Sequence, residues 1–186
     1  MKKIEASKVV NHPRHRVWGI LSNFKGVHNY HPFVESVELI TSKAYGEGAE
    51  RICHFYDGTS VAEKVTNWVE STGYSVDLTH FSLPFEKASA LIRIEPGSDR
   101  RFGTTKVVMS FHYKMKWGFL GDVIDFLLIR PLMERNLDQM LRGLEYHLAS
   151  GKVVTDSTLL PGQEMYEFES DPIINYDNWP TLPHAG

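Results

Sequence analysis

The sequence has almost none of the cysteine that disulfide frameworks and thiolate metal sites require. Cys53 is the single cysteine among 186 residues, so no disulfide and no all-cysteine metal site can form within one chain. Low cysteine usage is typical of reducing compartments, and we expect a cytoplasmic protein. Cys53 has no neighbouring residue in the sequence that would activate it, so we expect it to pack as a small inert hydrophobe.

Basic clusters and long apolar runs are also missing. The net charge is −3 and no basic block occurs, which argues against nucleic-acid binding. The most apolar stretch, around residues 126–129, is flanked by Asp125 and Arg130, so no integral membrane segment is expected. The two lysines near the N-terminus precede no apolar run, and no signal peptide is predicted.

Motifs for metals and nucleotides are missing as well. His28 and His31 lie three residues apart, but no HExxH motif occurs and no carboxylate lies at helical spacing from them. Gly46-Glu47-Gly48 lacks the third glycine and the following helix of a dinucleotide fingerprint, and a turn is predicted there. We therefore expect no metal and no cofactor.

The composition that is present is that of a soluble globular chain, 42% hydrophobic and 23% charged. We expect one domain over residues 1–151 and a C-terminal extension over 152–186. The extension is acidic and interrupted by proline, yet it carries large apolar residues such as Tyr166, Phe168 and Trp179. Two arrangements stay open for it: a loose tail, or a segment docked on its own domain or on a neighbouring subunit, which would form a homodimer.

Turn signals spaced about ten residues apart predict an antiparallel meander. Asp57-Gly58 is the strongest hairpin signal. Tight hairpins join only antiparallel neighbours, so a continuous antiparallel sheet is expected. The pattern predicts a strand over 3–10, a helix over 14–22, an irregular or second short helical segment over 23–32, and six strands over 33–42, 50–56, 59–70, 74–82, 86–96 and 104–116.

The longest helical pattern runs from Gly118 to Gly151. Apolar residues recur every four positions and form a wide face, in which Asn136 is the one polar member. Pro131 inside the pattern should kink or restart the helix. An antiparallel sheet must bury one face, and this helix is the large apolar surface left to cover it. The predicted class is α+β, a curved sheet around a long C-terminal helix.

Strand alternation predicts which side chains face that helix. Two features of the predicted inner face suggest a cavity: the small residues Ala88 and Ala90, and the carboxylate of Glu63, which is costly to bury without a partner. The alternative is a filled core in which Glu63 meets a basic group or a water. Other residues predicted on the inner face are Val61, Val65, Val69, Tyr74, Val76, Leu78, His80, Ile92, Ile94, Val107, Met109, Phe111 and Tyr113.

Several short motifs in order resemble the START-like, or SRPBCC, superfamily in its polyketide cyclase/dehydrase and lipid-transport branch. The resemblance covers about residues 3–150 and implies the Bet v 1-like helix-grip fold. The motifs are Pro13 to Trp18, Tyr30 to Val37, Gly46-x-Gly48-Ala49-x-Arg51, Asp57-Gly58 with Glu63, Leu83-Pro84, and Gly103-Thr104-Thr105.

The resemblance also implies a site. It places Arg51 on the inner face, where we expect it to approach Glu63 or to share a ligand group with it. It further implies that His31 and Phe33 lie at the pocket wall, that Cys53 and Phe55 face inward, and that Leu128, Leu132 and Asn136 face the cavity from the helix.

Three functions stay open. The first is binding or carriage of a small hydrophobic molecule such as a lipid, a polyketide or an aromatic compound. The second is a cyclase- or dehydratase-like enzyme that uses Glu63 with Arg51, and with His31, His80 and Tyr113 as nearby polar groups. The third is an interaction protein whose pocket is filled.

Overall fold

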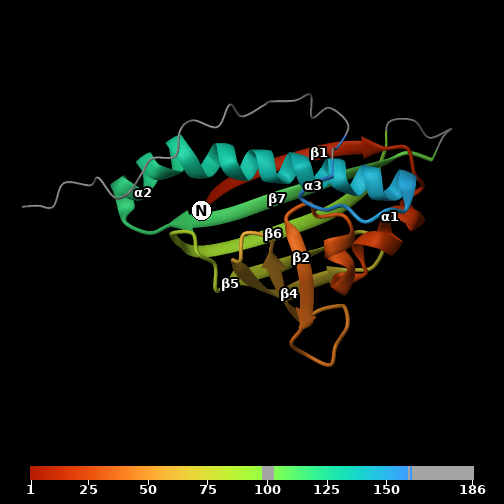
Figure 1. Cartoon of the computed structure of the whole chain (residues 1–186), viewed down its shortest axis with the longest axis horizontal. Helices are drawn as coiled ribbons and strands as arrows, with labels where there is room; N and C mark the ends of the chain where they lie inside the picture. Colours follow the sequence, from red (N-terminus) through yellow and green to blue (C-terminus); the bar gives the residue numbers. More distant parts are fainter. Residues whose placement is uncertain (98–102, 159, 161–186) are drawn as a thin grey trace, which may run out of the picture.

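The computed structural model describes residues 1–97, 103–158 and 160. Seven antiparallel strands form one sheet in the order β1-β7-β6-β5-β4-β3-β2, and a long helix lies across one face of it (Figure 1). The predicted α+β helix-grip fold is confirmed. The elements are β1 (Lys2–Val10), α1 (Arg14–Leu21), the 3-10 helix η1 (Phe24–Asn29), β2 (Val34–Leu39), β3 (Glu50–Phe55), β4 (Ser60–Val69), β5 (Gly73–Thr79), β6 (Phe85–Pro96), β7 (Thr105–Met115), α2 (Gly118–Ile124), the π-helical turn η2 (Asp125–Ile129) and α3 (Arg130–Ser150).

The β3–β4 hairpin forms at the predicted Asp57-Gly58 turn. Gly58 has a φ of 80°, a left-handed conformation that glycine adopts without steric cost. The Asp57 carboxylate accepts a hydrogen bond from the backbone N–H of Thr59 at 2.9 Å, as in an Asx turn. This hairpin brings β3 and β4 together, and these two strands carry the central polar residues of the cavity.

A β-bulge in β4 corrects one part of the predicted inner face. The register with β5 shifts between Val65 and Asn67, and such a bulge reverses the alternation beyond it. Trp68, not Val69, is therefore packed against the core, and its ring stacks on Tyr74 with centroids 5.2 Å apart. Val69 is exposed.

The long helix is continuous from Gly118 to Ser150, but its winding changes before Pro131. The π-helical turn η2 separates α2 from α3. Pro131 lacks a backbone N–H and its ring crowds the preceding turn, and a locally wider turn is one of the recognised responses. Gly151, at a φ of 70°, ends the helix. The predicted disturbance at Pro131 is thus a π-helical turn.

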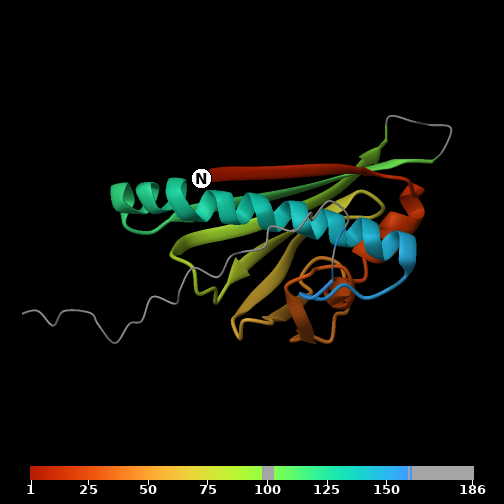
Figure 2. The ribbon, with the colours of Figure 1, turned by 45° about the horizontal axis from the view of Figure 1, so that its top comes forward.

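Burial along α3 is uneven. Leu141, Leu144 and Leu148 in its C-terminal half are buried in the main core. Gly143 lies so close to the chain that a Cβ there would meet the carbonyl oxygen of Tyr30 at 2.2 Å. This half rests over α1 and η1, as Figures 1 and 2 show. The earlier half of the helix leaves space between itself and the sheet.

The first residues of the C-terminal extension pack against the domain. The backbone N–H of Val154 donates to the carbonyl of Asn29 at 3.0 Å, and Val154 and Leu160 are buried. The rest of the extension, with Tyr166, Phe168 and Trp179, lies outside the described residues, as does any dimer formed through it. Among the described helices, none combines the length and apolar character needed to cross a bilayer.

Candidate functional site

A cavity of about 710 Å³ lies between the sheet and the long helix. Its wall is mainly apolar, and its volume is within the range of small-molecule sites. Fourteen of the seventeen residues predicted to bind a ligand line it: His31, Phe33, Arg51, Cys53, Phe55, Val61, Glu63, Val76, Ala88, Ala90, Met109, Phe111, Leu132 and Asn136.

The space exists because small residues occupy the middle of β6. Ala88 and Ala90 alternate on the face that the helix covers, and Ala90 pairs in register with Val76 of β5 and Phe111 of β7. A methyl group at these positions does not reach the helix, so the sheet and α3 remain apart there.

Arg51 and Glu63 form an ion pair at the cavity wall. They are register partners on β3 and β4, and Nε of Arg51 donates to Oε2 of Glu63 at 2.7 Å. A second guanidinium nitrogen donates to the same oxygen. The predicted approach of these two side chains is therefore present, and the Glu63 carboxylate has a basic partner.

The remaining contacts of Arg51 hold it in place. Its Nη1 donates to the carbonyl oxygen of Phe24, and its guanidinium carbon lies 4.0 Å from the centroid of the Phe24 ring, a cation–π arrangement. Burial is the largest single effect and would lower the pKa of Arg51, but the Glu63 carboxylate, together with Cys53, Tyr74 and Tyr30, outweighs it and the pKa is raised. The guanidinium stays charged, and each of its three nitrogens donates a hydrogen bond.

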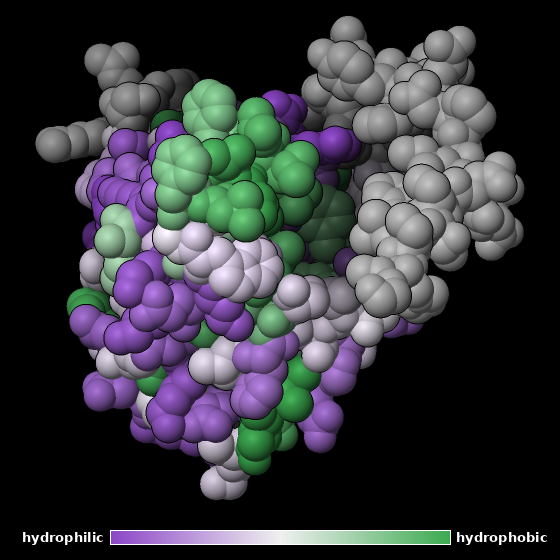
Figure 3. Space-filling view, turned by 90° about the vertical axis from the view of Figure 1, so that its left-hand side faces the viewer, coloured by the Kyte–Doolittle hydropathy of each residue, from purple (hydrophilic) through white to green (hydrophobic). Residues whose placement is uncertain are grey.

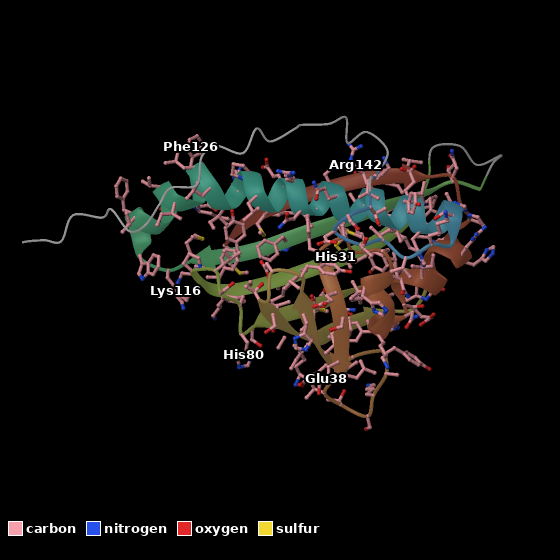
Figure 4. All side chains as sticks on the ribbon, viewed as in Figure 1. His31, Glu38, His80, Lys116, Phe126 and Arg142 are labelled. Atoms are coloured by element: carbon pink, nitrogen blue, oxygen red, sulfur yellow. The ribbon has the colours of Figure 1, made fainter. Side chains whose placement is uncertain are left out.

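His31 is held as a neutral imidazole. Its Nδ1 accepts a hydrogen bond from the backbone N–H of Phe33 at 3.2 Å. Burial, together with the positive charge of Arg51, lowers its pKa to about 4. A neutral imidazole that accepts at Nδ1 carries its proton on Nε2, so the ring retains one donor. Figure 4 shows His31 near the middle of the molecule, beneath α3.

Tyr74 adds a polar group that sequence reasoning did not select. It lies on the inner face of β5 and lines the cavity. Its hydroxyl is buried, and among the described residues it makes no hydrogen bond of good geometry, although the Tyr30 hydroxyl lies near enough to interact with it. Burial raises the pKa of both Tyr74 and its neighbour Tyr30. A buried hydroxyl without a well-formed hydrogen bond is costly, and a polar ligand group would supply one.

Three predicted site residues lie elsewhere. His80 follows the end of the central strand β5, with a φ of 56°, so it leaves the strand alternation and is exposed beyond the end of that strand (Figure 4). Tyr113 packs in a separate apolar cluster, where its hydroxyl donates to the carboxylate of Asp125. Leu128 is 65% exposed because a four-residue step drifts around a helix and the π-helical turn rotates this segment further.

The helix presents other residues to the cavity. Met133, Leu137 and Met140 line it beside Leu132 and Asn136. Met140 continues the four-residue step through Asn136, whereas Met133 and Leu137 lie off that step and fit the 3.6-residue period of the helix. Cys53 also faces the cavity, and burial raises the pKa of its thiol to about 12, so it is an unreactive part of the wall.

Solved structures share this fold. The protein XoxI from Bacillus cereus is 16% identical, with 81% of this chain and 97% of that chain covered and a TM-score of 0.66. A protein from Thermus thermophilus is 19% identical, with 81% and 99% covered and a TM-score of 0.64. The protein Ara h 8.0201 is 18% identical, with 80% and 98% covered and a TM-score of 0.61. At these identities the likeness shows the fold alone.

Sequence comparison supplies the family. No protein of curated function matches the chain significantly. The family model described as "Polyketide cyclase / dehydrase and lipid transport" matches residues 1–149, which include every strand and all but the last residue of the long helix. Family and fold together fit a protein that binds a hydrophobic ligand. The chain therefore belongs to the polyketide cyclase/dehydrase and lipid transport family.

Proposed function

We propose that this protein binds and carries a largely apolar, uncharged molecule that has one neutral hydrogen-bonding group, such as a carbonyl or a hydroxyl. The observation that carries the proposal is the cavity of about 710 Å³, whose single ion pair is already neutralised. The other polar groups at its wall include the neutral imidazole of His31, the buried hydroxyl of Tyr74 and the amide of Asn136, and Asp57 and Asp156 are also among the lining residues.

The ion pair disfavours a charged ligand group at the part of the cavity wall that it occupies. Arg51 directs two N–H groups to Glu63 and a third to Phe24. A carboxylate ligand would compete with Glu63 for the guanidinium, and an ammonium ligand would compete with Arg51 for the carboxylate. Either exchange leaves one buried charge without its partner, which is strongly unfavourable. A carbonyl or hydroxyl group needs only a neutral partner, and Tyr74 and His31 supply these.

The same pair weighs against the enzyme alternative. In a cyclase or dehydratase, Glu63 would take a proton from the substrate. A protonated Glu63 would leave Arg51 buried and unpaired, so each turnover would pass through a state that the surrounding contacts oppose. We therefore favour carriage over catalysis through Glu63.

A matched ligand series tests the proposal. Native mass spectrometry and displacement of a fluorescent apolar probe would compare an alcohol, a carboxylate and an amine of one chain length. The alcohol is expected to bind about tenfold or more tightly than either charged analogue, a difference of about 1.4 kcal/mol. Equal or tighter binding of the carboxylate, or no binding of any apolar compound, would overturn the proposal.

Two leucine substitutions locate the binding. Ala90→Leu places bulk in the cavity and is expected to abolish probe binding. Ser89→Leu, one residue earlier and on the outer face of β6, is the control and should bind as the parent chain does. If both variants bind the probe normally, the cavity is not the site.

A further inference from the structure

Large apolar side chains are gathered at one end of the molecule, away from the core. We define the apolar tip as eight such residues, all exposed: Trp117, Phe119, Leu120, Val123, Phe126, Leu127, Leu128 and Leu132. Phe119 and Phe126 are 83% and 74% exposed. Figure 3 shows hydrophobic residues clustered on this end. Exposed apolar residues are ordinary when scattered singly, but a contiguous group of this size marks an interaction surface.

The tip is held outward by specific contacts. Asp125, at the start of the π-helical turn, is buried and accepts hydrogen bonds from Tyr113 and from Lys2, the latter at 2.7 Å. Gly121 lies so close to the preceding turn that a Cβ there would meet the carbonyl oxygen of Lys116 at 2.0 Å. Trp117 has a φ of 67°, which is unusual for a bulky residue. The apolar face is thus built to stay exposed.

Charges around the tip favour a negative partner. The strand ends and helix turns that meet at this end carry six cations, Lys2, Lys87, Lys114, Lys116, Arg130 and Arg135, and four carboxylates, Glu86, Asp122, Asp125 and Glu134. Lys2 is paired with Asp122 and Asp125, and Lys114 with Glu86. This end therefore has an excess of two positive charges, while the whole chain carries −3.

We propose that the apolar tip docks onto the surface of a lipid bilayer that carries anionic headgroups. Tryptophan and phenylalanine beside lysine and arginine are the residues that favour the membrane interface. The tip projects from one end of the molecule, as Figures 1 and 2 show for α2, so it can enter an interface without displacing other elements. Basic residues at its border would lie at the level of the headgroups.

The tip is continuous with the cavity. Leu132 belongs to both: it is exposed at the end of the tip and lines the cavity wall. Docking through the tip would therefore bring the cavity close to the bilayer, which is a reservoir of apolar molecules. This last step rests on the proposed function, whereas the docking itself does not.

Vesicle binding of the full chain tests the docking. Flotation with vesicles of phosphatidylcholine, with and without phosphatidylserine, should show stronger binding to the anionic vesicles and weakening with salt. The double variant Phe119→Ser with Phe126→Ser is expected to lose about tenfold or more of the binding. The control is Ile40→Ser with Tyr45→Ser, which removes two exposed apolar residues ahead of β3 and should leave binding unchanged.

The outcomes separate the alternatives. Failure of the full chain to float with either vesicle overturns the docking, as does an equal loss in the control variant. A concentration-dependent dimer that the tip variant abolishes, without vesicle binding, assigns the surface to a second copy and overturns it too. Binding of the fluorescent probe in solution is measured in parallel and should be unchanged in the tip variant. Failure of the proposed ligand binding and failure of the proposed bilayer docking are thereby distinguished.

Discussion

Arg51 and Glu63 face each other across β3 and β4, and the adjacent register pair on the same two strands is Glu50 with Lys64. Each pair joins a basic side chain to a carboxylate, and the two pairs lie on opposite faces of the sheet. The side chain of Arg51 is 3% exposed and that of Lys64 is 60% exposed. One hairpin thus contains a buried pair and an exposed pair for direct comparison.

Breaking the buried pair should destabilise the protein far more than breaking the exposed one. Glu63→Gln leaves Arg51 buried without a counter-charge and should cost about 3–5 kcal/mol in the free energy of unfolding. Glu50→Gln should cost much less, because an exposed ion pair is screened by solvent and contributes little to stability. Chemical denaturation of both variants measures the difference. Replacing both partners, as in Arg51→Met with Glu63→Leu, should recover much of the loss, and similar costs for the two single variants would contradict the assignment.

The free energy of unfolding should decrease as the pH falls through the range in which His31 is protonated. Its pKa in the folded protein is about 4, below the value of about 6.5 for an unfolded chain. The unfolded state therefore binds the proton first, so the stabilisation is complete above about pH 6.5 and is lost as the pH falls toward 4. Denaturant titrations at several pH values measure this slope. His31→Gln should flatten it, and an unchanged slope in that variant would assign the effect to other groups.

Two helical glycines should respond oppositely to alanine. Gly143 of α3 lies against the carbonyl of Tyr30, whereas an added Cβ at Gly19 of α1 meets nothing within 4 Å among the described residues. Gly143→Ala should push the helix from η1 and cost about 1–3 kcal/mol. Gly19→Ala should stabilise by up to about 1 kcal/mol through helix propensity. Thermal unfolding of the two variants provides the test, and a stabilised Gly143→Ala would refute the close packing.

The anchor of the tip should depend on Tyr113. Its hydroxyl donates to the buried carboxylate of Asp125, and burial with that hydrogen bond raises the pKa of Tyr113 to about 12. Tyr113→Phe should cost about 1–3 kcal/mol and speed amide hydrogen exchange in residues 118–129. Tyr45→Phe, at an exposed tyrosine, is the control. Unchanged exchange at the tip would mean that Lys2 alone holds Asp125.

Much of this architecture could be predicted from the sequence because period and turn chemistry are local. The Asp57-Gly58 hairpin and the alternation of Ala88 and Ala90 are both local signals, and both lead to the observed elements. The approach of Arg51 to Glu63 was predicted through the family resemblance, since the pattern of β3 alone did not decide which residues face inward.

The predicted positions of some side chains are wrong where the backbone departs from regular strand alternation or helical period. The residue types at these places do not signal the departure. The bulge after Val65 moves Trp68 inward and Val69 outward. The left-handed conformation of His80 removes it from the strand pattern. The π-helical turn before Pro131 turns Leu128 to the surface. The pattern places Tyr74 on the correct face, but the surroundings of its buried hydroxyl depend on neighbours from other elements, which no local pattern contains.

Burial differs along the long helix, and it separates residues that control stability from residues that control ligand fit. Leu141, Leu144 and Leu148 fix one end in the core, and Asp125 fixes the other through Tyr113 and Lys2. Between these two anchored ends the helix crosses the cavity, and Met133 and Leu137 line the cavity from the helix. Substitutions at the anchored ends will change the stability of the fold, whereas substitutions at the cavity-lining residues of the helix will change which molecule fits the cavity. A chain built this way can alter its ligand while keeping its fold.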